Sequence, residues 1–377
     1  MPRKGENIYK RKDGRWEGRY IKNRDGKKAV YGYVYAKSYS DVKKKLLMKK
    51  TDALTALNIP NRNESKDASF SEISDLWLIA IRSSIKESTW FKYRNSLKKH
   101  IAPKIGKINI SKIDYELTHR MCNELLETGG TAQNGLSNKT VSDILSILKA
   151  VIKYAERLKY NIDRTALDVS IKIKMYPLRV LSKQEEQILF NQLTDDMGYT
   201  ELGVLISMFT GIRIGELCAM TWEDISWDTN EIHIRRTIQR IPTDNEIAKT
   251  KIIITEPKSQ CSIRNIPIAT TLRKYLVLSK SCHGYILTGK SGYFIEPRTM
   301  QNRFKDILQV CNIQDATFHT LRHTFATRCV ELGVDIKSLS EILGHANVNI
   351  TLNRYVHPSM DEKQKNIDKL SNLFTVK

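Results

Sequence analysis

FHTLRHTFATRCVELGVDIKSLSEILGHANVNITLNRY, residues 318–355, is the stretch of sequence that decides the fold. In its first part leucine, phenylalanine and cysteine recur at helical spacing, and a glycine follows where a helix ends with a positive φ. Asp335 is predicted to cap a second helix that ends at Gly344, and Asn349 a third that runs to Tyr355. The stretch therefore predicts three short helices joined by tight turns.

Four polar side chains of this stretch fall at predicted helix ends and turns: His319, Arg322, His345 and Tyr355. His319 and Arg322 are three residues apart, so they share one helix face. Guanidinium groups match phosphate oxygens, imidazoles donate or move protons, and tyrosine can act as a covalent nucleophile. A free phenol ionises only near pH ~10, so it needs cationic neighbours to attack. The combination suits transfer of a phosphoryl group onto a protein hydroxyl.

A second motif, TGIRIGEL at residues 210–217, follows a strongly apolar run. Arg213 and Glu216 lie three residues apart on one helical turn, so the carboxylate can hold the guanidinium in place for a phosphate. By spacing alone, a surface ion pair is the commoner explanation. Further on, three strands are predicted, with a turn between the last two: residues 231–235, 251–255 and 263–268.

Together these motifs resemble the C-terminal signature of the tyrosine recombinase, or phage integrase, family, most closely the integrases of conjugative transposons and related prophages. The resemblance is specific over residues 181–357 and loose over residues 1–180. The family places a mobile active-site lysine in the turn between the strands. That pattern assigns this role to Lys258, with Lys251 and Lys249 as weaker substitutes.

The resemblance implies a role for each side chain of the site. Arg213 and Arg322 would clamp the oxygens of the scissile phosphate, and His319 and His345 would donate hydrogen bonds or move protons there. Tyr355 would attack to form a 3′-phosphotyrosine link, and the turn lysine would protonate the departing 5′-oxygen. Bond energy stays in the protein–DNA link and side chains supply the positive charge, so no cofactor, metal or ATP is implied.

The charge of the chain supports a nucleic-acid partner. Its 62 Lys and Arg outnumber 41 Asp and Glu, giving a net charge of +21. Double-stranded DNA is the leading candidate partner, and an acidic membrane surface is the alternative. No apolar run approaches ~18 residues and the N-terminus has no hydrophobic signal core, which predicts a cytoplasmic protein without a membrane segment. With DNA as its partner, the protein is expected to associate with the bacterial nucleoid.

Residues 1–60 carry a concentrated share of this charge, with 17 Lys and Arg against 6 Asp and Glu. Short β-favouring runs separated by turns predict three strands in two hairpins, followed by a helix. Such a basic sheet either reads a major groove or is a solvated face. It resembles the arm-site DNA-binding domain of integrases, in which case the candidate contacts are Arg15, Arg19 and Lys22.

Residues 68–172 are predicted to be helical throughout, between polar or basic linkers, and resemble the core-site DNA-binding domain of the family. Exposed basic side chains usually serve solubility, but the lysines and the arginine on the polar faces of these helices are candidate phosphate contacts. They are Lys92, Arg94, Lys98, Lys149 and Lys153. With a mostly helical α+β catalytic domain over residues 181–377, the prediction is a multidomain, mainly α protein.

The resemblance also implies partners. The family acts as a homo-tetramer on two DNA duplexes, reading core-type and arm-type sites, and the two DNA-binding regions imply an excisionase and DNA-bending accessory proteins. The C-terminal tail has an apolar stripe at Ile367, Leu370 and Phe374. Such a stripe usually packs on its own domain, whereas in the family the C-terminal helix docks onto a neighbouring protomer.

Three other functions remain open. His319 and His323 have a metal-like spacing, which a zinc hydrolase would use, but no glutamate follows His319 and no third ligand has an obvious spacing. A non-catalytic helix-turn-helix regulator would explain the charge but not the polar residues of the motif. A type IB topoisomerase would share the nucleophile and the phosphate clamp.

Overall fold

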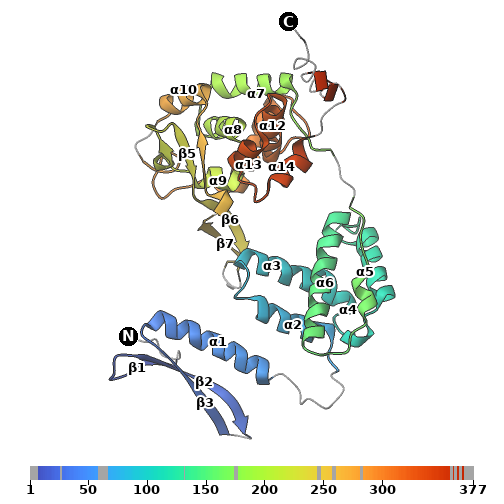
Figure 1. Cartoon of the computed structure of the whole chain (residues 1–377). Helices are drawn as coiled ribbons and strands as arrows, with labels where there is room; N and C mark the ends of the chain where they lie inside the picture. The colour runs from blue at the N-terminus through green and yellow to red at the C-terminus, as the bar shows by residue number, and fades with distance from the viewer. Residues whose placement is uncertain are drawn as a thin grey trace, which may run out of the picture. The chain divides into compact units, whose positions relative to one another are not determined.

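The computed structural model of the chain describes residues 7–25, 28–57, 67–130, 132–173, 177–243, 248–256, 260–280, 283–356, 360, 363–364 and 367–368. The chain forms two compact units, residues 1–175 and 176–377 (Figure 1). It is mainly helical with a small N-terminal sheet, which confirms the predicted fold class. The finer division at 1–60, 68–172 and 181–377 stays a prediction.

The N-terminal part is a sheet of three antiparallel strands followed by one helix: β1 (Ile8–Lys10), β2 (Trp16–Asp25), β3 (Lys28–Ala36) and α1 (Tyr39–Leu57). Helix α1 buries Val42 and Leu46 against Trp16 and Val34 on one face of the sheet. The aromatic side chains of β3 stay exposed because successive residues of a strand point to opposite faces. The two predicted hairpins and the helix are confirmed.

The rest of the first unit is helical, as predicted. Its elements are α2 (Phe70–Ile81), α3 (Glu87–Ser96), a π-helical turn (Leu97–Ile101), α4 (Ala102–Ile105), a 3-10 turn (Ile110–Lys112), α5 (Tyr115–Thr128), α6 (Asn138–Arg157) and a second 3-10 turn (Arg164–Leu167). Ser69 and Glu72 form a reciprocal capping box that starts α2. Helix α6 lies in the centre because one side of it is almost wholly apolar and buried.

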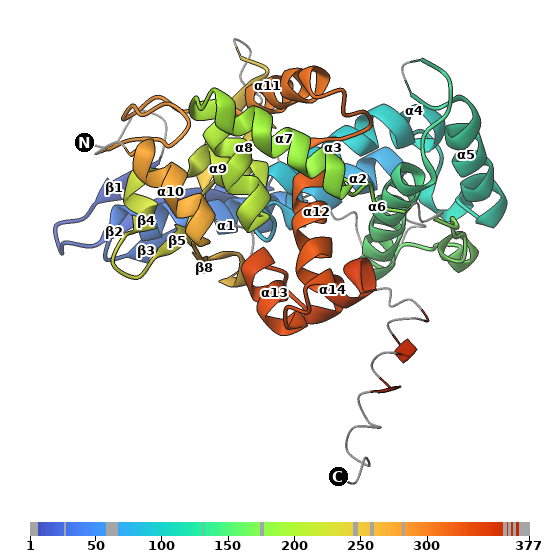
Figure 2. The same ribbon diagram turned by 90° about the horizontal axis from the view of Figure 1, so that it is seen from above.

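The second unit begins with helices and contains two small sheets. Its helices are α7 (Lys183–Asp195), α8 (Tyr199–Thr210), α9 (Ile214–Ala219), α10 (Thr270–Leu278), α11 (Pro297–Val310), α12 (Phe318–Glu331), α13 (Ile336–Leu343) and α14 (Val348–Tyr355). Its strands are β4 (Ile225–Ser226), β5 (Glu231–Ile234), β6 (Thr237–Pro242), β7 (Thr250–Thr255) and β8 (Arg264–Pro267). A short 3-10 turn, Trp222–Asp224, precedes β4, and another, Gln260–Ser262, precedes β8. The buried helix α8 anchors the core of the unit (Figure 2).

The strand pairing differs from the prediction that β7 and β8 flank one turn of a single β region. Strand β7 pairs with β6, which the sequence did not reveal, and β8 pairs with β5 in a separate sheet. Because Thr237 lies opposite Thr255 and Pro242 opposite Thr250, β6 and β7 form their own hairpin. The short β8 instead lies at the edge of the sheet formed by β4 and β5.

The three helices of the opening motif form as expected, with one correction. Asp335 caps α13, and Gly344 ends it with φ of 64°. The predicted cap at Asn349 is wrong, because α14 starts at Val348 and its cap is Asn347, whose side-chain oxygen accepts from the backbone N–H of Asn349. Asn347 and Asn349 are both residue types that cap helices, and the structure uses the earlier one.

Replacing Gly211 with alanine is expected to destabilise the second unit by about 2–4 kcal/mol. Gly211 ends α8 with φ of 61°, and an added Cβ would lie 2.5 Å from the Phe325 ring and 3.0 Å from Leu343. Gly333→Ala is the matched control, because Gly333 has φ of 76° but open space around its Cβ, so only the backbone cost of about 1 kcal/mol applies. Urea unfolding measures both, and equal losses would contradict the packing explanation.

Candidate functional site

The end of helix α13 presents backbone carbonyl groups to arginines from other parts of the second unit. Arg322 donates from Nη2 to the carbonyl of Leu343 at 2.7 Å and from Nη1 to that of Gly211 at 2.8 Å. Arg213 donates from Nη2 to the carbonyl of Gly344 at 3.2 Å. The free carbonyls at a helix C-terminus carry partial negative charge, so they hold guanidinium groups well.

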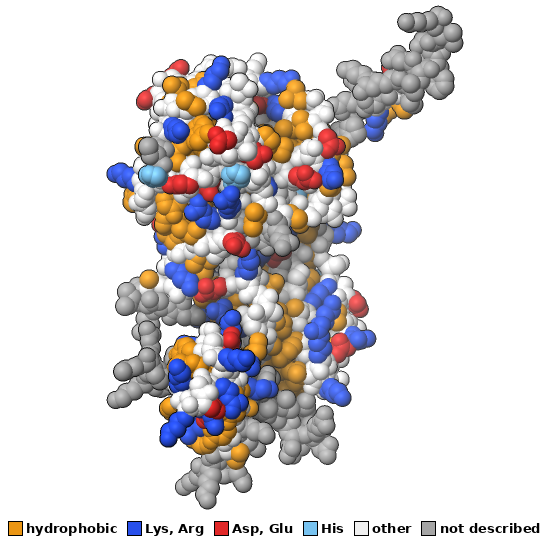
Figure 3. Space-filling view, turned by 60° about the vertical axis from the view of Figure 1, so that its left-hand side comes forward, with side chains coloured by type: hydrophobic (Ala, Val, Ile, Leu, Met, Phe, Trp, Pro, Cys, Tyr) orange, Lys and Arg blue, Asp and Glu red, His pale blue; other side chains and the backbone are white. Residues whose placement is uncertain are grey.

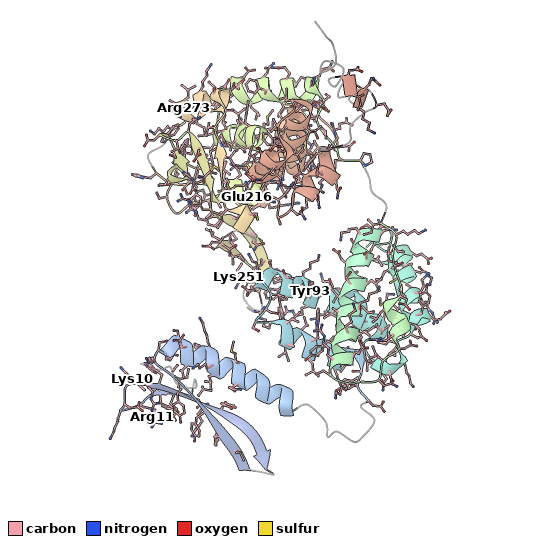
Figure 4. The ribbon with its side chains drawn as sticks, viewed as in Figure 1. Lys10, Arg11, Tyr93, Glu216, Lys251 and Arg273 are labelled. Carbon is pink, nitrogen blue, oxygen red and sulfur yellow. The ribbon has the colours of Figure 1, made fainter. Side chains whose placement is uncertain are left out.

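A third arginine completes this arrangement. Arg264, the first residue of β8, donates from Nε to the carbonyl of Ile342 at 2.5 Å and from Nη2 to Glu216 at 2.9 Å. Glu216, which Figure 4 labels, is buried, and its other oxygen accepts from Nη1 of Arg213 at 2.8 Å. One carboxylate thus orients two guanidinium groups, and the three arginines together keep an excess of positive charge.

Arg213 and Glu216 also form the start of helix α9. Arg213 is the N-cap residue, and its backbone N–H donates to Glu216 at 3.1 Å. The predicted pairing is therefore more than a surface ion pair, because Glu216 is only 3% exposed while Arg213 keeps 37% of its side chain exposed. The exposed guanidinium remains available to an anion from solvent.

Tyr355, the last residue of α14, lies with its hydroxyl inside the protein. It packs on Ala326, Leu339 and Leu343, and only 7% of it is exposed. Its hydroxyl lies 2.9 Å from Nδ1 of His323, which is also buried. The predicted nucleophile is therefore held by an imidazole that the sequence had suggested only as a metal ligand.

The other two histidines lie around this pair. His345 is half-buried, hydrogen-bonds through Nδ1 to Oγ1 of the buried Thr351 at 2.8 Å, and stacks nearly parallel to the Tyr355 ring at 6.4 Å. His319 lies one helical turn before His323, and their rings meet edge to face at 4.5 Å. Two imidazoles thus lie against the phenol, and the third lies against His323.

Burial and positive charge shift the pKa values of this group. Burial, and then the charges of neighbouring arginines, lower the pKa of His345 to about 4, and burial and the His319 ring lower the pKa of His323 to about 4. Partial burial and the Arg322 charge lower the pKa of His319 to about 4 as well. This histidine nevertheless keeps more than a third of its surface exposed. Burial raises the pKa of Tyr355, and the Arg322 charge offsets part of this rise.

Arg322 shows how strongly the site favours an anion. Burial and the nearby charges of Arg213 and Arg264 lower the pKa of Arg322 to about 9, a large shift for a guanidinium. A bound phosphate would relieve this repulsion, since its oxygens carry the opposite charge. The excess positive charge of the three arginines therefore favours an anion at this site.

Stability is expected to fall as the pH is lowered from about 6.5 towards 5. An unfolded histidine has a pKa of ~6.5, whereas the pKa values of His319, His323 and His345 in the folded chain are about 4. The unfolded state therefore binds more protons in this window, and the free energy of unfolding decreases as the pH is lowered. Urea unfolding at several pH values should show uptake of two to three protons, and a flat profile above pH 5 would contradict this assignment.

The described residues bring together most of the side chains that the sequence singled out, namely Arg213, Glu216, His319, Arg322, His345 and Tyr355. Lys258 lies outside the described residues. Of its possible substitutes, Lys251 lies exposed on β7 and Lys249 just before that strand (Figure 4). Sequence reasoning missed Arg264 and the contact of His323 with the tyrosine.

The candidate DNA contacts all lie in the first unit. Arg15 is exposed and bound to Asp13 at 2.8 Å, and Arg19 lies over the Tyr31 ring at 4.5 Å, while the Lys22 side chain is outside the described residues. Figure 3 shows lysine and arginine side chains gathered at the foot of the view, over the β1–β3 sheet and α1. The tyrosines of β3 are exposed and contact some of these arginines, as Tyr35 contacts Arg11. Figure 4 labels Lys10 and Arg11, at and just after the end of β1.

The helical part presents the remaining candidates on its surface. Lys92 pairs with Asp143 at 3.1 Å, and Arg94 lies over the rings of Trp90 and Phe91 at 4.9 and 4.8 Å. Lys98 and Lys153 are exposed, and Lys149 is partly buried one turn before Lys153 on α6. These positions leave basic groups on the outside of the helices.

Neither a metal site nor a membrane segment is found in the described part of the chain. Among the described residues, no group of three or more His, Cys, Asp and Glu side chains gathers as a metal would require. His319 and His323, the pair with metal-like spacing, contact each other and the phenol. None of the helices within the described ranges has the length and apolar character to cross a bilayer.

Known proteins resemble the chain in both sequence and structure. The model of the phage integrase family matches residues 179–362, and that of the phage integrase N-terminal SAM-like domain matches residues 69–126. A XerC-like tyrosine recombinase of Caldanaerobacter subterraneus is 27% identical, covering 89% of this chain and 91% of the relative. The ICEBs1 integrase of Bacillus subtilis is 26% identical, covering 82% and 84%.

Solved structures share the fold. The Tn1549 transposon integrase in complex with transposon right end DNA has a TM-score of 0.68 at 21% identity, covering 81% of this chain and 100% of that one. A lambda integrase tetramer bound to a Holliday junction has a TM-score of 0.55 at 16% identity, covering 90% and 96%. These structures show the fold, and the family follows from the two family models and the relatives of similar length: the chain belongs to the phage integrase family of tyrosine recombinases.

Proposed function

We propose that the chain is a site-specific DNA recombinase that integrates and excises a mobile genetic element by cutting and rejoining DNA strands. The observation that carries this proposal is the buried Tyr355 hydroxyl, which lies in the same cluster as three arginines on the end of α13. A nucleophile beside an unneutralised anion site is the arrangement that phosphoryl transfer needs.

In this proposal Arg213 and Arg322 bind the two non-bridging oxygens of the scissile phosphate. The Tyr355 oxygen attacks phosphorus, the bond to the 5′-oxygen breaks, and a 3′-phosphotyrosine link forms. His319 and His345 donate hydrogen bonds to the pentavalent phosphorus group, and both are neutral at pH 7. The 5′-hydroxyl of a partner strand then reverses the step, so the reaction needs neither ATP nor a metal.

The leaving 5′-oxygen must receive a proton, and we assign this step to Lys258. The assignment rests on the position of Lys258 in the family pattern. The substitutes are Lys251, which lies on β7, and Lys249, which lies just before that strand. An ammonium group is a suitable acid because it also neutralises the charge that develops on the leaving oxygen.

DNA binding is assigned to the first unit. Residues 1–60 would bind arm-type sites through the basic sheet, residues 68–172 would bind core-type sites, and residues 181–377 would carry out catalysis. The lambda integrase structure is a tetramer on a Holliday junction, and we propose a homo-tetramer on two duplexes here as well. An excisionase and DNA-bending proteins are the proposed partners, and the bacterial cytoplasm and nucleoid the proposed location.

The test is strand exchange between two DNA duplexes that carry the ends of the element and its target, in EDTA and without ATP. Recombinant products from the wild type, and none from Tyr355→Phe, are expected. Relaxation of supercoils without exchange would favour a type IB topoisomerase. Tight DNA binding with neither product would favour a helix-turn-helix regulator.

A further inference from the structure

His323 is the one histidine of the cluster whose ring nitrogen touches the Tyr355 hydroxyl among the described residues. The distance from Nδ1 to the phenol oxygen is 2.9 Å, and both residues are 7% exposed. Two buried polar groups at this distance share a hydrogen bond that water does not replace. The contact therefore constrains the nucleophile directly.

The direction of this hydrogen bond follows from the two groups. At neutral pH the phenol keeps its proton, because burial raises the pKa of Tyr355, and the imidazole is uncharged, because the pKa of His323 is about 4. If Nδ1 donated, the phenol proton would have no other protein acceptor within the described part of the chain. The buried hydroxyl is satisfied when it donates to Nδ1, which leaves the ring proton on Nε2.

The other two histidines are less well placed to take this proton. Nδ1 of His345 already bonds to Thr351, and its ring lies parallel to that of Tyr355 rather than edge-on. His319 contacts the ring of His323 and not the phenol. Among the side chains that the structure describes, no hydrogen bond joins a ring nitrogen of His319 or His345 to the Tyr355 hydroxyl as Nδ1 of His323 does.

We propose that His323 is the general base of the cleavage step and accepts the proton of Tyr355 as that residue attacks DNA. This inference rests on the proposed recombinase function. As the bond from the Tyr355 oxygen to phosphorus forms, the O–H proton passes to Nδ1 and gives an imidazolium, while the bond to the 5′-oxygen breaks and that oxygen takes a proton from the general acid. The negative phosphate stabilises the imidazolium, and the reverse step returns the proton to the phenol.

The role of His323 also explains the burial of Tyr355. A phenol hidden from water is protected from side reactions, but it loses water as a proton acceptor. The neutral imidazole of His323, in contact with the hydroxyl, supplies that acceptor. It adds no positive charge that would stabilise the phenolate form of Tyr355 before DNA binds. The pairing keeps the nucleophile unreactive until a phosphate enters the arginine cluster.

The test is single-turnover cleavage of a nicked DNA substrate by wild type, His323→Asn and Tyr355→Phe from pH 6.5 to 9. The oxygen of the asparagine side chain lies close to the position of Nδ1, so it keeps the hydrogen bond but cannot accept the proton. Cleavage by His323→Asn is expected to be about 100-fold slower at pH 7, or more, and to recover tenfold per pH unit. The wild-type rate should change little over this range.

A substrate with sulfur in place of the bridging 5′-oxygen separates the two proton transfers. A thiolate leaves without being protonated, so a defect on the leaving-group side disappears with this substrate. The His323→Asn defect should persist, because it lies on the nucleophile side. Loss of the defect with sulfur, or cleavage within threefold of wild type on the ordinary substrate, would overturn the proposal.

Two controls keep the outcomes distinct. DNA binding and thermal melting are compared for each variant, and His323→Gln, which keeps an amide of different reach, replaces His323→Asn if the latter does not fold. Tyr355→Phe should give no adduct at any pH. If wild type also gives none, the recombinase function itself fails, whereas a fast wild type with an equally fast His323→Asn rejects only the role of His323.

Discussion

Replacing Arg322 with alanine is expected to slow formation of the covalent protein–DNA adduct by about 10²–10³-fold. Its guanidinium is 3% exposed and is fixed by the carbonyls of Gly211 and Leu343, so its remaining N–H groups are aimed before DNA binds. Such preorganised donors stabilise the charge of the transition state without reorganisation. Single-turnover cleavage of a nicked substrate measures the loss.

Arg322→Lys is the sharper variant, because it keeps the positive charge. A lysine has one nitrogen and cannot reach both carbonyls and a phosphate, so most of the loss should remain. Arg303→Ala, which removes an exposed arginine of α11 in the same unit, is the matched control and should cleave at the wild-type rate. Full activity of Arg322→Lys would show that charge alone is needed.

Replacing Glu216 with alanine is expected to destabilise the second unit by about 3–5 kcal/mol. Glu216 is 3% exposed, and its loss leaves the guanidinium groups of Arg213 and Arg264 without their shared carboxylate. Urea unfolding measures the change. Glu223→Ala removes an exposed carboxylate a few residues away and should change stability by no more than about 0.5 kcal/mol.

The pH dependence of this effect has a definite sign. Burial alone would raise the pKa of Glu216, but the charges and hydrogen bonds of Arg264 and Arg213 outweigh burial and lower it. The stabilisation is therefore complete above the ordinary glutamate pKa of ~4.5 and is lost as the pH falls through the lower folded value. The difference between wild type and Glu216→Gln should shrink in that acidic range, and a difference that grows there would contradict the assignment.

The parts of the fold that the sequence predicted are those with local signals. Capping by Asp335, the end of α13 at Gly344 and the apolar spacing of α12 each depend on residues within one or two turns. Strand β6 was missed because residues 243–249, which join it to β7, are too long for the two-residue turn signals that mark a hairpin in a sequence. Choosing between two nearby asparagines as the α14 cap also needed backbone geometry.

In the candidate site too, contacts between residues close in the sequence could be predicted, and contacts between distant residues could not. Arg213 and Glu216 are three residues apart, so their contact could be predicted, whereas Arg264 meets Glu216 across 48 residues and Ile342 across 78. His323 was visible only as a histidine one turn from His319. Its contact with the tyrosine depends on how α14 returns to α12, which no spacing along the chain reveals.

The most direct test of the account is to locate the bond between protein and DNA. Wild-type protein is incubated in EDTA with a nicked DNA that prevents rejoining, and the adduct is digested and sequenced by mass spectrometry. A single phosphodiester between Tyr355 and a 3′-phosphate is predicted. Attachment at another residue, linkage to a 5′-phosphate, or tight DNA binding without any adduct would contradict it.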